Sequence, residues 1–237
     1  MNEIDFCTLD VSCPYLSGKN SRTMYKYVDG CDFAYNSKLV KEGFRRFGNY
    51  FSTPICDGCN ECKSLRIDAL NFKFTKSLRR VIRKNSDTKI RISKPNLSNE
   101  HIKLYEKYHK FMHEKRGWEF HELNFNRYYH VYVEGAGSFG YEVDYFVEDK
   151  LVCVDLIDLV DDGISSIYCY YDTNFAHLSL GKFSLLTQIK LACEHNLRWI
   201  YLGFYVKGCP SLEYKDEYKP YQILNNTNGD LIWENLE

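Results

Sequence analysis

The 237-residue sequence predicts an α+β fold, a mixed sheet with flanking helices that is preceded by a small cysteine-containing N-terminal module. Three observations predict it. Three strand-like segments succeed one another through residues 141–171, a helical segment and one more strand follow them, and three closely spaced cysteines lie upstream. Because 44% of the residues are hydrophobic, the chain can bury a sizeable core.

Composition and charge narrow the class of protein. A formal net charge of -1 argues against a protein that coats nucleic acid with its whole surface, although it leaves room for a local basic patch. The acidic N-terminus does not resemble a signal peptide, and no apolar run approaches the ~20 residues of a membrane span. We therefore expect a cytoplasmic protein with neither a membrane nor DNA as a partner. In that compartment the ten cysteines stay reduced.

The N-terminal module is expected to be rich in loops, with a strand at residues 23–28 and a helix that begins at Ser37 and ends at Gly43. Arg45 and Arg46 follow, set between two phenylalanines. Two interpretations are open. The pair either neutralises the carbonyls at the C-terminus of the preceding helix, or it forms a binding site for an anion.

Three cysteines, Cys56, Cys59 and Cys62, are separated by turn-forming residues. Three thiolates at this spacing can converge on one metal, because the turns let the backbone curl around it. Cys13, which precedes a proline, is the best candidate for a fourth ligand. Zinc and an iron–sulfur cluster both accept four thiolates, and reduced cysteines without a metal are the alternative.

A basic segment follows strands expected at residues 65–69 and 71–74. We expect a helix capped by Ser77 in this segment, and residues 73–94 hold nine basic side chains and one acidic one. Four of the cations share a turn and a half of that helix: Arg79, Arg80, Arg83 and Lys84. Their heads can cover one surface and displace counterions from a nucleic-acid backbone, which we favour over a merely solvated face.

The next segment, residues 98–116, has the apolar periodicity of a helix. Its three histidines, His101, His109 and His113, are expected at the surface or an interface, without a chemical role. Residues 126–134 are compatible with a strand or a helix.

A glycine-rich break at residues 135–137 is the predicted domain boundary. It divides the chain into an N-terminal module, residues 1–135, with the cysteine cluster and the basic helix, and a catalytic domain, residues 136–237.

The C-terminal domain begins with three predicted strands at residues 141–147, 151–159 and 164–171. Tight turns join them, so they should form an antiparallel meander. A helix at residues 180–195 and a strand at residues 199–203 follow. Meander, helix and strand occur in this order in the core of an acetyltransferase-like (GNAT-type) sheet, where the start of the helix binds the acyl donor.

The start of that helix has features of a ligand site. Ser179 is a good N-cap, and Gly181 would let a ligand approach the free amides of the first turn, where the helix dipole favours a phosphate or an oxyanion. The next strand reaches Gly203, where a ligand or a neighbouring strand could approach the backbone closely. The same parts also occur in many folds that bind nothing there.

Short motifs follow one another in a characteristic order along nearly the whole chain: Cys13-Pro14-Tyr15-Leu16, Gly43-Phe44-Arg45-Arg46, the Cys56/Cys59/Cys62 turn, Arg79-Arg80, Asp161-Asp162-Gly163 through Tyr168, Ser179-Leu180-Gly181, Tyr201-Leu202-Gly203, and Gly208-Cys209 through Tyr214-Lys215. In this order they resemble the bacterial aminoacyl-tRNA-protein transferases, and most closely the branch that transfers leucine to N-terminal aspartate or glutamate. The resemblance implies a reaction in which Leu-tRNA donates leucine to the α-amine of such proteins and so marks them for degradation by the N-degron pathway.

The resemblance also implies site residues. An aminoacyl ester is already activated, so no cofactor is required for transfer. The protein has to orient an amine with a pKa near ~7.7 and stabilise an oxyanion. The amides of Gly181 and Lys182 and the hydroxyl of Tyr214 are candidates for these roles. The carbonyls around Tyr170 and Tyr171 would position the attacking nitrogen.

Cations would hold the two substrates. Arg45, Arg46 and Arg66 are candidates for gripping the acceptor's carboxylate. The four cations of the basic helix would hold the acceptor stem, Ser179 would contact the aminoacyl end, and Lys215 would bind a terminal phosphate.

The sequence leaves three other functions open: transfer of arginine in place of leucine, N-acetyl transfer from an acyl-CoA, and a non-catalytic, metal-stabilised RNA-binding module.

Overall fold

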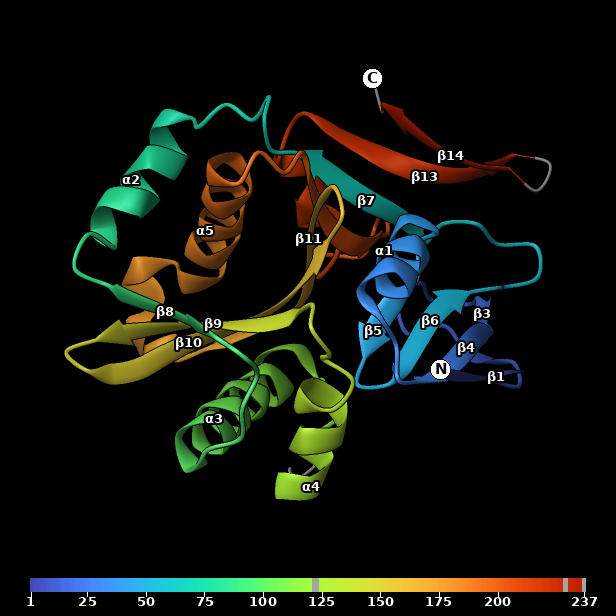
Figure 1. The fold of residues 1–237 in the computed structure, drawn as a ribbon, viewed down its shortest axis with the longest axis horizontal. Coiled ribbons are helices and arrows are strands. Elements are labelled where there is room, and N and C mark those ends of the chain that lie inside the picture. Colours follow the sequence, from blue (N-terminus) through green and yellow to red (C-terminus); the bar gives the residue numbers. More distant parts are fainter. Residues whose placement is uncertain (121–123, 228–229, 236–237) are drawn as a thin grey trace.

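The computed structural model describes residues 1–120, 124–227 and 230–235. In this part of the chain, helices cover both faces of a large sheet (Figure 1). Helices α2 (Lys76–Lys84) and α5 (Leu180–Glu194) lie on one face, and α3 (Asn99–Arg116) and α4 (Phe125–Tyr128) lie on the other. None of the described helices is both long and apolar enough to cross a membrane.

The remaining helical segments are shorter, and they are α1 (Phe33–Lys41), the π-helix Tyr129–Val133 and the 3₁₀ helices Thr173–Leu178 and Glu213–Glu217. Helix α1 begins one turn before the expected start, because the Asp32 carboxylate accepts a hydrogen bond from the Tyr35 amide at 2.7 Å. Helix α2 is capped by Thr75 rather than by the expected Ser77, because the Thr75 side chain accepts a hydrogen bond from the Leu78 amide. The segment from residue 126 to 134, for which strand and helix were both open, is helical up to Val133.

The large sheet has eight strands in the order β14-β13-β7-β12-β11-β10-β9-β8 within the described residues. Their bounds are β7 Lys63–Asp68, β8 Lys89–Ser93, β9 Gly140–Val147, β10 Lys150–Val160, β11 Gly163–Tyr171, β12 Trp199–Tyr205, β13 Tyr221–Thr227 and β14 Asp230–Asn235. The predicted antiparallel meander β9-β10-β11, helix α5 and the strand that follows it are confirmed.

Two cores form because β10 is covered on both faces. Cys153 and Ile157 belong to the core beneath α5, whereas Val154 and Leu156 belong to the core beneath α3. This alternation follows from the two-residue period of a strand. It explains why almost every residue of β10 is buried and why the segment has no polar face.

The smaller sheet has the order β1-β4-β6-β5, with β1 Asn2–Cys7, β4 Thr23–Asp29, β5 Arg45–Phe47 and β6 Tyr50–Pro54. The strands β2 (Val11–Ser12) and β3 (Asn20–Ser21) pair separately. Strands β7 and β8 belong to the large sheet, although both precede residue 135. The boundary expected between residues 135 and 136 is therefore not a division between sheets.

Strands β11 and β12 are parallel neighbours that diverge. In the described residues their pairing covers only Gly163–Ser165 and Trp199–Tyr201. Beyond this point β12 shifts its register against β7, and Gly203 adopts a positive φ of 68°. The divergence leaves backbone carbonyls of both strands without a partner from the neighbouring strand, so other groups have to bind them.

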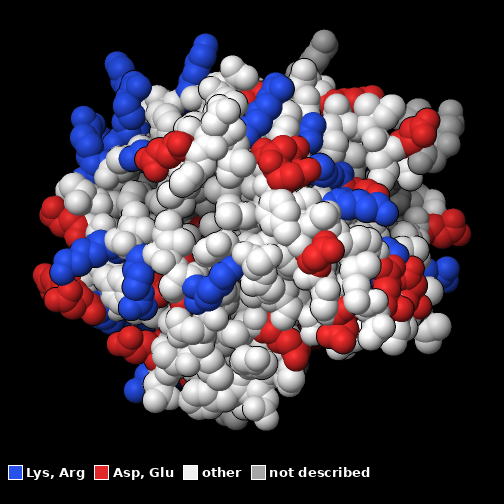
Figure 2. Space-filling model, in the orientation of Figure 1, with Lys and Arg blue, Asp and Glu red and all other residues white. Residues whose placement is uncertain are grey.

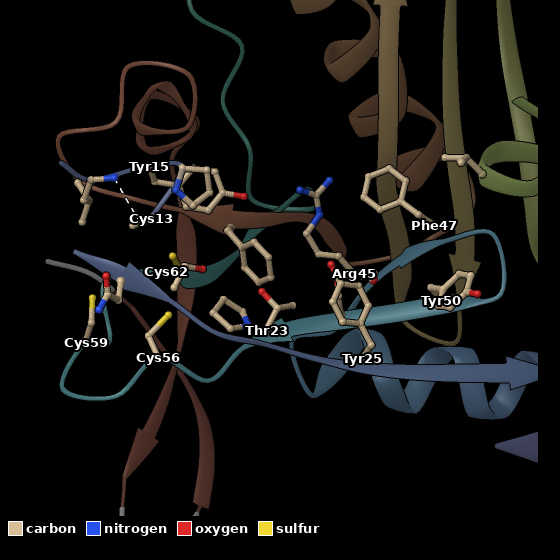
Figure 3. A pocket seen from close by; sticks show the side chains of 18 of the residues that line it. Cys13, Tyr15, Thr23, Tyr25, Arg45, Phe47, Tyr50, Cys56, Cys59 and Cys62 are labelled. Carbon is tan, nitrogen blue, oxygen red and sulfur yellow. Dashed lines mark hydrogen bonds between the residues drawn. The ribbon is translucent and has the colours of Figure 1, made fainter. Parts of the chain in front are cut away.

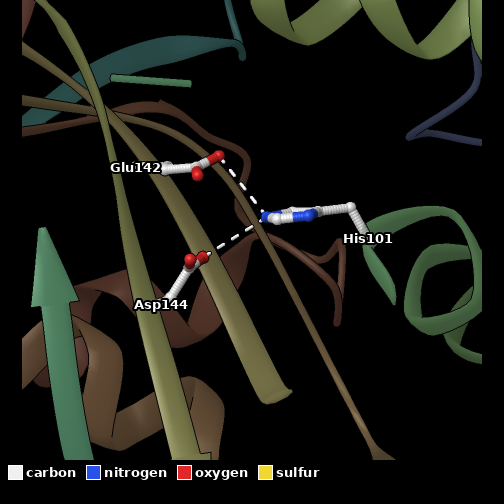
Figure 4. Close-up of side chains that lie close together, drawn as sticks. All are labelled: His101, Glu142 and Asp144. Carbon is white, nitrogen blue, oxygen red and sulfur yellow. Dashed lines mark ion pairs between the residues drawn. The ribbon is translucent and has the colours of Figure 1, made fainter. Parts of the chain in front are cut away.

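A buried ion cluster fastens α3 to the sheet. The His101 Nε2 atom lies 3.5 Å from carboxylate oxygens of Glu142 and Asp144 on β9 (Figure 4). Asp144 also pairs with Arg91 at 2.7 Å. Burial favours the neutral imidazole, but Asp144 and Glu142 outweigh it and raise the pKa of His101 to about 9. The imidazolium and Arg91 therefore balance both carboxylates.

We expect His101→Gln to lower the free energy of unfolding by about 3 kcal/mol at neutral pH. A histidine with a raised pKa stabilises the fold fully below its unfolded pKa near 6.5 and loses this effect as the pH rises through about 9. Urea unfolding at neutral pH and at pH ~10 measures both effects. An equal loss of unfolding free energy at the two pH values would contradict a positively charged His101.

Candidate active site

A pocket of about 500 Å³ opens between the smaller sheet and the part of the chain around Phe204 and His130 (Figure 3). Five aromatic side chains line it: Tyr15, Tyr25, Phe47, Tyr50 and Phe204. The guanidinium of Arg45 also faces the pocket, and cysteines lie at the opposite end from Phe47 and Tyr50. A pocket of this composition suits a ligand that has an apolar part and one negative charge.

Arg45 occupies the opening between the diverging strands. Its Nη2 atom donates to the Ile167 carbonyl of β11 at 3.1 Å, and its guanidinium lies over the rings of Phe47 and Phe204. Gly203 of β12 makes the approach possible, since an added Cβ would come within 2.5 Å of the Arg45 Nε atom. The expectation of a close approach at Gly203 is thus met by an arginine side chain.

Three tyrosines influence the pKa of this cation. Burial lowers the pKa of Arg45, and the hydroxyls of Tyr15, Tyr214 and Tyr168 act in the opposite direction. These tyrosines come from three separate parts of the chain, so the site exists only in the folded protein. Arginine stays charged in spite of burial, which leaves a partly desolvated cation at the pocket.

Arg46, also expected to bind the acceptor's carboxylate, does not face the pocket. Successive residues of a strand point to opposite faces, so Arg46 enters the core while Arg45 faces outward. Its Nε and Nη2 atoms donate to the two carboxylate oxygens of Asp158, each at 2.7 Å, and both residues are buried. The site prediction for Arg46 is therefore wrong, because its guanidinium already makes a bidentate pair with the carboxylate of Asp158.

Arg66 is also held by the protein. Its guanidinium lies between the rings of Trp199 and Trp233, at 3.8 and 4.4 Å from their centroids. Its Nε and Nη2 atoms donate to the Gln222 side chain, and Nη1 donates to the Tyr201 hydroxyl. These contacts leave Arg45 as the arginine among the three that lines the pocket.

Lys215 is buried, whereas its neighbour Tyr214 is exposed. The ammonium of Lys215 is buried and donates to the carbonyls of Leu202, at 2.9 Å, and Phe204. Burial lowers its pKa well below the usual value. Lys215 thus binds carbonyls that β12 exposes after leaving β11, and the phosphate role predicted for it is wrong. Tyr214, 45% exposed, is accessible to a ligand.

The start of α5 differs from the expected cap. Ser179 has φ 55° and ψ 48°, and its side chain makes no capping hydrogen bond, because the same residue ends the preceding 3₁₀ helix. The Lys182 amide donates to the Ser179 carbonyl at 2.9 Å, so this amide is not free for an oxyanion. Gly181 lies beneath the Tyr171 ring, whose Cε1 atom would be 3.1 Å from an added Cβ.

All four predicted cysteine ligands, Cys13, Cys56, Cys59 and Cys62, line the pocket. Their soft sulfurs suit zinc or an iron–sulfur cluster in kind. Their spacing does not suit a single tetrahedral ion, because within the described residues no three of these sulfurs lie within 4.8 Å of one another. Burial, together with the neighbouring thiols, raises the pKa of Cys62 to about 12, which keeps that thiol protonated.

Basic side chains gather over α2, as Figure 2 shows. Arg79, Arg80 and Arg83 are exposed and, with Lys76, line a groove. Lys84 is exposed too, although its ammonium donates to the His177 carbonyl at 3.0 Å. The apolar face of α2 packs on the core through Leu78, Val81 and Ile82, and this contact directs the arginines outward.

Tyr15, Tyr168 and His109 are not among the site residues predicted from the sequence. Tyr15 and Tyr168 lie within motifs that carried the family resemblance, so their place in these motifs was the available signal. His109 had no such signal, because its relation to β11 depends on how α3 packs.

Family models cover most of the chain. Residues 11–80 match "Arginine-tRNA-protein transferase, N terminus", and residues 100–225 match "Arginine-tRNA-protein transferase, C terminus". These matches, together with the mixed sheet and its cation-bearing pocket, define an aminoacyltransferase. The chain belongs to the arginine-tRNA-protein transferase family.

Two curated relatives match this chain over almost its whole length. The chain is 54% identical to an aspartate/glutamate leucyltransferase of Campylobacter jejuni, over 99% of this chain and 100% of the relative. It is 37% identical to an aspartate/glutamate leucyltransferase of Helicobacter hepaticus, over 99% of this chain and 98% of the relative. The solved structure of L-PGS from Bacillus licheniformis covers 73% of this chain and matches over 58% of its own length, at 13% identity and a TM-score of 0.49, too low to establish a shared fold.

Proposed function

We propose that this enzyme transfers leucine from Leu-tRNA to the α-amine of proteins that begin with aspartate or glutamate, and thereby marks them for degradation. The observation that carries the proposal is the 54% identity, over the whole chain, to a protein named for this reaction. The pocket adds a physical reason for an acidic acceptor, because its wall places one arginine among aromatic rings.

Arg45 would bind the acceptor's side-chain carboxylate. A guanidinium can grip a carboxylate with two hydrogen bonds, and partial burial strengthens that contact relative to water. The acceptor's α-amine would then lie close to the place where β11 and β12 diverge. Asparagine has the same shape as aspartate but no charge, so it would leave Arg45 unpaired and bind poorly.

Leucine transfer needs no covalent intermediate on the protein in this proposal. The ester bond of Leu-tRNA is already reactive, so the protein has to orient the amine and stabilise the oxyanion rather than supply a nucleophile. Tyr214, whose side chain is exposed, is the candidate that would donate a hydrogen bond to the oxyanion. We also assign the large sheet to the GNAT type, on the basis of its antiparallel meander followed by α5 and a diverging parallel strand.

The body of the tRNA would lie on α2. Replacing both Arg79 and Arg80 by Gln should raise the KM for Leu-tRNA about 10-fold at moderate salt. The slope of log K against log salt concentration should become shallower by about two, because two phosphate contacts are lost. Steady-state assays at several salt concentrations measure both effects. Lys38→Ala on α1, which removes another exposed cation, is the control. An unchanged KM in the double variant would place the tRNA elsewhere.

No metal takes part in the proposed transfer. The zinc or iron–sulfur site at Cys13, Cys56, Cys59 and Cys62 stays a prediction. Metal analysis and a visible absorption spectrum of anaerobically purified protein test it, with Cys59→Ser as the comparison.

The direct test offers the wild-type protein one peptide beginning with aspartate and several donors. Label from Leu-tRNA, but not from Arg-tRNA or acetyl-CoA, should appear on the peptide. Transfer from Arg-tRNA instead would make the enzyme an arginyltransferase, and tRNA binding without any transfer would support a binding module.

A further inference from the structure

A histidine and a tyrosine form a hydrogen-bonded pair on the α3 face of the sheet. His109 of α3 and Tyr168 of β11 are both half-buried, and the Tyr168 hydroxyl lies 2.8 Å from the His109 Nε2 atom. The Tyr105 ring stacks on the imidazole with its centroid 3.7 Å away. The pair is therefore held in place by packing from one side and remains partly accessible.

The hydrogen bonds of His109 fix the direction of proton transfer. Its Nδ1 atom lies 3.0 Å from the Tyr105 carbonyl, which can only accept, so Nδ1 carries the proton. In the neutral imidazole, Nε2 is then an acceptor, and the Tyr168 hydroxyl donates to it. This arrangement is that of a base whose tautomer is set by a second contact.

The pair lies next to the site described above. The Phe47 ring lies next to both groups, since the Arg45 guanidinium is over that ring and the Tyr168 ring packs edge-on against it. Tyr168 directly follows Ile167, whose carbonyl binds Arg45. In an aspartate, a single carbon separates the side-chain carboxylate from the carbon that bears the α-amine, so an acceptor bound to Arg45 by its carboxylate would keep its amine close to Arg45.

We propose that Tyr168 and His109 form a proton relay for the attacking α-amine, an inference that rests on the proposed function. As the nitrogen forms its bond to the leucyl carbonyl carbon, it gives a proton to the Tyr168 oxygen, and Tyr168 gives its own proton to His109 Nε2. The ester C–O bond then breaks, and the proton returns along the same path to the ribose oxygen of the tRNA. Protons and charges balance without any other reactant.

The surroundings of His109 keep it a neutral base. Burial lowers its pKa, which the hydrogen bond to the Tyr105 carbonyl offsets only in part. The titratable groups that face the imidazole are the phenols of Tyr105 and Tyr108 on α3 and of Tyr168 on β11. Burial raises the pKa of Tyr168, so this phenol passes a proton on without accumulating as a phenolate.

The test compares His109→Gln and Tyr168→Phe with the wild type. Each variant should lower kcat about 10²-fold at neutral pH, with little change in the KM for the peptide, because general base catalysis contributes about that factor. The phenylalanine keeps the stacking of Tyr168. His195→Gln, at the exposed end of α5, is the matched control and should transfer at the wild-type rate.

Two readouts separate a relay from a merely structural pair. Added imidazole should restore part of the activity of His109→Ala. The acidic limb of the plot of kcat against pH should also change its shape once His109 is absent. Variants that melt like the wild type and keep kcat within about 3-fold of it would overturn the relay, as would a failure of imidazole to rescue. If the wild type transfers nothing to any peptide, the proposed function itself is wrong.

Discussion

Replacing Arg45 by methionine should lower kcat/KM for a peptide that begins with aspartate by about 10²-fold or more. Truncating one partner of a buried charge pair costs about 2–5 kcal/mol, because the other charge is left without compensation. Methionine keeps much of the aliphatic length and the contact with Phe47 and Phe204, so the pocket should keep its shape. Transfer of labelled leucine to the peptide at several concentrations measures the effect.

A second acceptor provides the control for this variant. Transfer to a peptide that begins with asparagine is slow in the wild type by our account, and Arg45→Met should change it little, because no carboxylate is lost there. Arg45→Lys keeps the charge but not the bidentate fork, and should fall between the wild type and Arg45→Met. An equal loss with both peptides would show that Arg45 only supports the pocket.

The neighbouring arginine should behave in the opposite way. Arg46→Met should lower the free energy of unfolding by about 3–5 kcal/mol, because it leaves the fully buried Asp158 without its partner. Urea unfolding followed by circular dichroism measures this loss. At a temperature where the variant stays folded, its KM for the peptide should be that of the wild type, since Arg46 does not reach the pocket.

A double variant tests the physical reason. Removing both charges, as in Arg46→Met combined with Asp158→Leu, should restore most of the stability, because a buried ion pair is about as stable as apolar residues of similar volume. A double variant that is less stable than Arg46→Met alone would indicate that packing around Arg46, including its contact with Phe139, matters more than charge.

The sequence was most informative where structure is local. The three strands from Gly140 to Tyr171, helix α5 and β12 were predicted because alternation, tight turns and a continuous apolar helix depend on neighbouring residues. The place of β7 was not predictable in this way. Its strand was expected, but only tertiary contacts decide that it pairs between β12 and β13 in the large sheet.

The candidate site was predicted in composition but not in geometry. Arg45, Arg46 and Arg66 looked equivalent in the sequence. In the structure, strand alternation turns Arg46 into the core, where it pairs with the buried Asp158. The guanidinium of Arg66 is held between two tryptophan rings. Lys215 was expected to be a surface cation, since nothing local shows that β12 leaves β11 and exposes carbonyls to it. His109 required the packing of α3 on the sheet.

One assay tests the central claim most directly. Wild-type protein and radiolabelled Leu-tRNA are incubated with four peptides that differ only in the first residue, which is aspartate, glutamate, asparagine or arginine. We predict rapid addition of leucine to the first two and addition about 10²-fold slower to the others, the discrimination expected when a partly buried arginine is left unpaired. Equal labelling of all four peptides, or of none, would contradict it.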